Sequence, residues 1–144
     1  MIEKDTVRLL RECDRGVQMG VDAIIDVYDR VESESLKKYL KNCKDEHEKL
    51  NDEIQQLLSD YKDDGKDPNP IVQGMSKMKT ELKLAVDSGD ATIAELMTDG
   101  CNMGVKSLNK YLNQYEAADE VSKDIAKRLI NLEERLAVDI RGYL

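Results

Sequence analysis

Apolar residues recur along most of this chain at alternating spacings of three and four positions. That spacing is typical of amphipathic helices that bury one face. Short polar stretches interrupt the pattern at intervals. The chain is therefore predicted to form five helices, over residues 6–31, 35–62, 70–87, 91–115 and 119–143.

Each of the four longer helices carries a continuous apolar stripe, and the four stripes are predicted to form one common core. The only histidine, His47, falls on the second stripe. In chain order the predicted core positions are Leu10, Cys13, Val17, Gly20, Ile24, Val27 and Val31; Leu36, Leu40, Cys43, His47, Leu50, Ile54, Leu57 and Tyr61; Ala94, Met97, Cys101, Gly104, Leu108, Tyr111 and Tyr115; and Ile125, Leu129, Leu132, Leu136, Asp139 or Ile140, and Tyr143.

Residues with side chains suited to helix N-caps precede three of these helices. Ser33 and Ser35 lie before the second helix, and Asp119 lies before the last. Thr92, with Glu95 three positions later, fits a capping box. The connection between the first two long helices and the connection between the last two are therefore predicted to be short. Each of these two pairs of helices would then form an antiparallel hairpin.

A six-residue phrase occurs twice in the chain and indicates an internal duplication. Residues 16–21 read Gly-Val-Gln-Met-Gly-Val and residues 100–105 read Gly-Cys-Asn-Met-Gly-Val, so four of six positions are identical. Two similar hairpins are the simplest explanation. Residues 62–91 are predicted to be a long crossover containing the short helix, which lets the second and third long helices run in the same direction. The first and third would then lie adjacent and antiparallel.

Length and composition fit one domain over residues 1–144. The net charge of −8 repels phosphate backbones and anionic lipids, so nucleic acid and membrane partners are not expected. We expect neither a signal peptide nor a membrane span. Three cysteines without a CxxC spacing indicate reduced thiols, and a cytoplasmic location is the expectation.

These features resemble the ferritin-like fold, and more narrowly an uncharacterised bacterial family of small ferritin-like bundles. The matching stretches are Arg11-Glu12-Cys13-Asp14-Arg15-Gly16, Met78-Lys79-Thr80-Glu81-Leu82-Lys83 and Met97-Thr98-Asp99-Gly100. The resemblance implies an all-α, ferritin-like four-helix bundle of two pseudo-symmetric antiparallel hairpins, with a short extra helix in the long crossover. It implies no particular activity.

The ligand set of a ferritin-like di-iron site is largely missing. Such a site needs interior carboxylates from all four helices and two Glu-x-x-His pairs. The residue three positions before His47 is Lys44, and the position equivalent to His47 in the second half is Glu133, three positions after Ile130. A di-iron centre is therefore not expected, and no catalytic residue is identified.

A different metal site is an alternative. Cys43 and His47 lie four positions apart on one helix face, and Cys101 is expected near the same level. With Glu133 or Met103 as a fourth ligand, such a set would bind zinc or iron. We favour a structural role for these side chains, because cysteine packs as a small buried hydrophobe and a lone core histidine is usually held by a hydrogen bond. No cofactor is expected on that interpretation.

Glycines inside helices cost stability, so the repeated Gly-x-x-x-Gly indicates a compensating gain. Close packing of the first helix against the third, or room for Met19 and Met103, is the preferred explanation. A pocket for a small ligand at Gly20 and Gly104 is the alternative.

The sequence alone thus favours a non-enzymatic bundle that acts as a binding or assembly module. Metal-binding or redox and small-ligand carrier roles remain the alternatives. A protein partner or a homodimer is expected, with Tyr39, Val86 and the helix over 70–87 as candidate contact residues.

Overall fold

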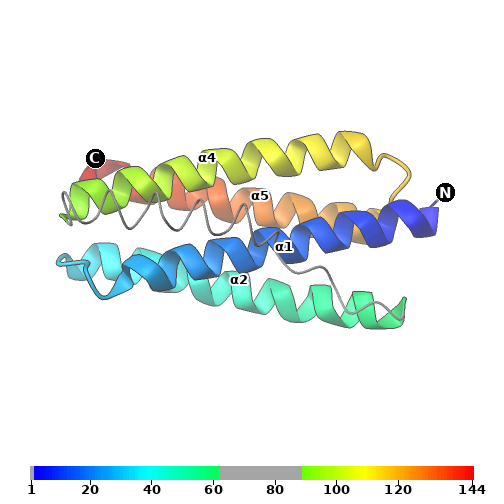
Figure 1. Cartoon of the computed structure of the whole chain (residues 1–144), viewed down its shortest axis with the longest axis horizontal. Helices are drawn as coiled ribbons and strands as arrows, with labels where there is room; N and C mark the ends of the chain where they lie inside the picture. The colour runs from blue at the N-terminus through cyan, green and yellow to red at the C-terminus, as the bar shows by residue number, and fades with distance from the viewer. Residues whose placement is uncertain (1, 62–88) are drawn as a thin grey trace.

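The computed structural model describes residues 2–61 and 89–144, and all of the regular structure within these ranges is helical (Figure 1). The elements are α1 (Ile2–Tyr28), α2 (Glu34–Asp60), α4 (Asp90–Gln114), α5 (Glu120–Ile140) and a 3₁₀ turn, η1 (Arg141–Tyr143). The fold is all-α with four long helices, as predicted. The expected helix over 70–87, including Val86, lies outside the described residues.

The four helices form two antiparallel hairpins, α1 with α2 and α4 with α5 (Figure 1). Helix α1 also packs against both α4 and α5, and α2 packs against α5. Helices α1 and α4 run antiparallel, whereas α2 and α4 run in the same direction. Helix α1 therefore touches three other helices, and a larger part of its circumference is buried than one stripe requires.

The core is built mainly from the predicted stripes. Leu10, Cys13 and Val17 are buried with Leu50, Leu129 and other residues in one cluster, and Ile24, Leu40, Cys101 and Leu136 belong to a second. Of the residues placed on the second stripe, Leu57 is only partly buried and its neighbour Leu58 takes the core position. Ile140, rather than Asp139, is buried at the end of α5. Among the described helices, none has a stretch long and apolar enough to cross a bilayer.

Two of the predicted N-caps are confirmed. The Ser33 hydroxyl accepts a hydrogen bond from the backbone N–H of Leu36 at 3.3 Å, and the Asp119 carboxylate accepts one from the N–H of Ser122 at 2.8 Å. The capping box at Thr92 is wrong, because α4 begins earlier, at Asp90, with Gly89 as its N-cap. Thr92 lies inside the helix and is buried.

The α1–α2 turn and the α4–α5 turn are each hydrogen-bonded to the other hairpin. Asp90, at the start of α4, accepts hydrogen bonds from the backbone N–H groups of Glu32 and Ser33, both at 2.9 Å. At the opposite end, Asp5 of α1 accepts from the N–H of Ala117 at 3.1 Å, and the Thr6 hydroxyl accepts from the N–H of Asp119 at 2.8 Å. These contacts fix the position of one hairpin along the other.

We predict that Asp90→Ala lowers the free energy of unfolding by about 1–2 kcal/mol, because two backbone N–H groups of the α1–α2 turn lose a charged acceptor. Urea denaturation monitored by circular dichroism measures the change. Asp99→Ala, in the exposed part of the same helix, is the control and should change stability by less than about 0.5 kcal/mol. Equal effects of the two substitutions would contradict the assignment.

Candidate functional site

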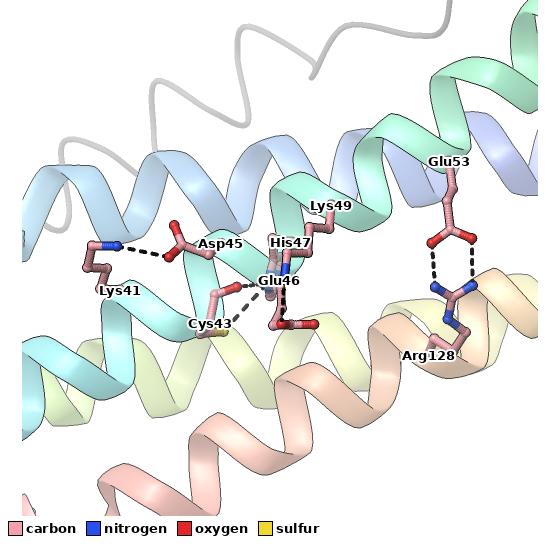
Figure 2. A network of polar contacts seen from close by, with 8 residues as sticks. All are labelled: Lys41, Cys43, Asp45, Glu46, His47, Lys49, Glu53 and Arg128. Carbon is pink, nitrogen blue, oxygen red and sulfur yellow. Dashed lines mark hydrogen bonds and ion pairs between the residues drawn. The ribbon is translucent and has the colours of Figure 1, made fainter.

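The central polar contact of the bundle joins α2 to α5. His47 is 1% exposed, and its Nε2 lies 2.8 Å from Oε1 of Glu133. Its other ring nitrogen, Nδ1, lies 2.8 Å from the backbone carbonyl oxygen of Cys43, one turn earlier in α2 (Figure 2). Both nitrogens of the imidazole are thus engaged by groups of the same chain.

The chemistry of these contacts fixes the number of protons. A carbonyl oxygen only accepts, so Nδ1 must carry a hydrogen and donate it to Cys43. At 2.8 Å, the Nε2 to Glu133 contact also needs one hydrogen between its two atoms. That proton resides either on His47, giving an imidazolium and a carboxylate, or on Glu133, giving a neutral pair. In both cases the pair holds one proton more than a free neutral histidine and a free carboxylate.

The surroundings of His47 act on its pKa in opposite directions. Burial disfavours the charged imidazolium and lowers the pKa, but the hydrogen bonds with Cys43 and Glu133 and the negative charge of Glu133 outweigh burial. The pKa of His47 is raised from 6.5 to about 10. The protonated pair is therefore the stable form at neutral pH, and the Glu133 side chain, at 12% exposure, shields it from solvent on one side.

Two thiols border the pair. Cys43 Sγ lies 3.5 Å from His47 Nδ1, and Cys101 of α4 interacts electrostatically with the Glu133 carboxylate. Burial and the negative charge of Glu133 raise the pKa of Cys101 far above its usual range. Cys13, in the other core cluster, has its pKa raised by burial to about 12. All three cysteines are free and buried. Because the thiolate is the nucleophilic form, the raised pKa values make the thiols of Cys13 and Cys101 poor nucleophiles.

The structure brings together all four residues of the sequence-predicted metal set: Cys43, His47, Cys101 and Glu133. Within the described ranges, however, no three such side chains are arranged to hold a metal ion. Neither nitrogen of His47 presents a lone pair to an ion while the protons occupy the positions given above. Met103, the other candidate ligand, is 66% exposed.

Two glycines make room for the pair. A Cβ atom on Gly20 of α1 would lie 3.1 Å from Nε2 of His47 and 3.4 Å from Oε1 of Glu133. On Gly104 of α4 it would lie 3.6 Å from Cδ of Glu133. Side chains from α2 and α5 therefore occupy the space beside Gly20, and Glu133 of α5 occupies the space beside Gly104.

The repeated glycines do not have repeated environments. A Cβ on Gly16 would meet Leu129 of α5 at 3.5 Å, whereas Gly100, its equivalent in α4, has no described atom within 4 Å of that position. Helix α1 packs diagonally against α5, but α2 and α4 have no comparable contact among the described residues. The two halves therefore differ at the positions where their sequences agree best.

A second buried polar cluster escaped the sequence analysis. Asp14 of α1 is 1% exposed and accepts hydrogen bonds from Gln18 at 3.0 Å and from Gln55 of α2 at 2.8 Å. Glu12 is also buried, with its Oε2 3.8 Å from Arg15 Nη1. Burial and the charge of Glu12 raise the pKa of Tyr111 of α4. Gln18 lies four positions after Asp14, a spacing at which the two side chains can hydrogen-bond on one helix face, and this spacing could have indicated the cluster from the sequence.

The two clusters are separate. Glu12 and Asp14 lie eight and six residues before Gly20, which is about 12 Å and about 9 Å along the axis of α1 at 1.5 Å per residue. The carboxylates of α1 therefore do not join Glu133 in one ligand set. Comparison with protein-family models, with curated proteins and with solved structures finds no match, so the chemistry of the two clusters has to be inferred from the chain itself.

We predict that Gly20→Ala destabilises the protein by about 1–2 kcal/mol, although alanine is the better helix former by about 1 kcal/mol. The new methyl group would displace the His47 ring from Glu133. Gly104→Ala is the matched control, because its methyl group makes only an ordinary contact, and it should stabilise the protein by up to about 1 kcal/mol. Urea midpoints measure both; changes of the same sign would contradict the prediction.

The proton of the pair predicts a pH dependence. Because the folded-state pKa of His47 is about 10 and the unfolded value is near 6.5, the contribution of the pair is complete below pH 6.5 and is lost as the pH rises through 10. Between pH 7 and 8.5 the free energy of unfolding should fall by about 1.4 kcal/mol per pH unit more than in the double variant His47→Gln/Glu133→Gln. Parallel pH profiles of the two proteins, measured by urea denaturation, would exclude the extra proton.

Proposed function

We propose that this chain is a non-enzymatic, ferritin-like helical bundle that acts as a binding or assembly module. The observation that carries the proposal is the closed hydrogen bonding of the buried His47–Glu133 pair. Both ring nitrogens of His47 are used within the chain, Nδ1 by the Cys43 carbonyl and Nε2 by Glu133. A histidine held in this way serves stability and has no free nitrogen for a substrate.

Nucleophilic and metal-assisted catalysis both lack support in the described interior. The thiols of Cys13 and Cys101 have raised pKa values, whereas a catalytic cysteine needs a lowered one. The buried carboxylates occur in two clusters at different levels of the bundle, whereas a di-iron centre needs them around one point. The polar interior is therefore assigned to holding the helices in register.

Binding is accordingly assigned to the outer surface. With a net charge of −8, the surface favours a protein partner over nucleic acid or an anionic membrane, and it fits the cytoplasm. Exposed apolar side chains on α1, α2, α4 and α5 provide contact area for a partner or for a second copy of the chain. Among the large ones are Ile25, Tyr39, Met103 and Val121.

The rival metal-binding role predicts a different elemental composition. After exposure to Fe(II) or Zn(II) and removal of excess ions, we expect the protein to retain less than about a tenth of an equivalent of metal per chain. The described residues contain no set of three His, Cys, Asp or Glu side chains arranged to hold a metal ion. Elemental analysis measures it.

Near-stoichiometric metal that is lost in His47→Ala would overturn the proposal. Because that variant also leaves Glu133 without its partner, Cys101→Ala serves as a second test that keeps the pair intact. Metal lost in both variants would identify the four-residue set as a binding site.

A further inference from the structure

A groove of about 700 Å³ runs along the outside of the bundle between α2 and α5. Its apolar floor consists of Leu57, Val121 and Ile125. Ile125 is buried and Leu57 partly buried, but Val121 is 55% exposed in the first turn of α5. From Val121 to Arg128 the groove follows seven residues of α5, about 10 Å or two helical turns.

The rim of the groove is acidic. Asp52 and Glu53 line it from α2, and Glu120 and Asp124 line it from α5. Glu120 is explained by its place in the first turn of a helix, where the dipole favours an acid. The other three lie within helices, where the dipole gives no such reason.

The positive charge in the groove is already neutralised. Arg128 is the one cation among the described residues that line it, and it pairs with both carboxylate oxygens of Glu53 (Figure 2). Its Nη1 also lies 3.7 Å from the Asp124 carboxylate. Lys123, which does not line the groove, lies 4.0 Å from the Glu120 carboxylate. Four carboxylates beside these two cations still leave the groove negatively charged around an apolar floor.

We propose that this groove binds a basic amphipathic helix of a protein partner, a proposal that rests on the binding role given above. Apolar side chains at spacings of three and four would cover Leu57, Val121 and Ile125, and flanking Lys or Arg would pair with the rim acids. A second copy of this chain is a poorer occupant, because a symmetric contact would place the acidic rims against each other.

The test uses fluorescence anisotropy and two labelled 18-residue peptides of the same Leu and Lys composition. In one the leucines follow helical spacing, and in the other they are scrambled. We expect the intact protein to bind the patterned peptide at least about tenfold more tightly than the scrambled one. Equal binding would show general attraction to an acidic protein and would overturn the proposal, as would no binding.

Two matched variants locate the binding. Val121→Lys places a cation on the groove floor, whereas Val138→Lys makes the same change of charge on the same helix, at a residue of similar exposure (52%) that does not line the groove. We expect Val121→Lys to weaken binding of the patterned peptide by about tenfold or more and Val138→Lys to change it by less than about twofold. Equal weakening would overturn the proposal.

Two further measurements separate the remaining outcomes. A dimer in sedimentation that Val121→Lys dissociates, and Val138→Lys does not, would assign the groove to a second copy and overturn the proposal. Cross-linking in extracts of the source cell tests the binding role itself. If intact protein and Val121→Lys capture the same partner equally, the binding role stands and the groove proposal fails; if the intact protein captures none, the binding role fails.

Discussion

The structure depends most on the proton shared by His47 and Glu133. The two residues come from different hairpins, so the contact closes the interior between α2 and α5. Charged groups removed from water are stable only when they are paired and fully hydrogen-bonded. The carbonyl of Cys43 supplies the remaining bond of the imidazole, and the missing side chain of Gly20 supplies the space for the ring. One polar contact thus accounts for a buried histidine and a helix glycine.

Much of the fold follows from periodic patterns that local physics fixes. The stripes predicted the helices and most of the core, and Ser33 and Asp119 cap helices as their side chains predict. Patterns fail where burial depends on how many helices surround a position. Because α1 contacts three others, Asp14 is buried although it lies outside the apolar stripe. Thr92 was misplaced as a cap because α4 begins two residues earlier, at Asp90, with Gly89 as its N-cap.

The sequence predicted which residues form the candidate site, but not how their side chains hydrogen-bond. Cys43, His47 and Cys101 could be grouped from stripe positions and from the repeat. Their bonding depends on hydrogen-bond directions across helices, which spacing does not encode. The glycines illustrate the same limit. A sequence shows that Gly20 lacks a side chain, but the neighbours that occupy its space come from positions 47 and 133.

The turn contacts at the two ends of the bundle have a consequence for how the hairpins can move. Asp90 binds the α1–α2 turn, and Thr6 binds the α4–α5 turn, at opposite ends of the long axis (Figure 1). Sliding one hairpin along the other by a single helical turn, about 5.4 Å, would break both sets together. A shifted arrangement of the two hairpins is therefore not stabilised by these turn contacts, and we expect the hairpins either to dock completely or to separate.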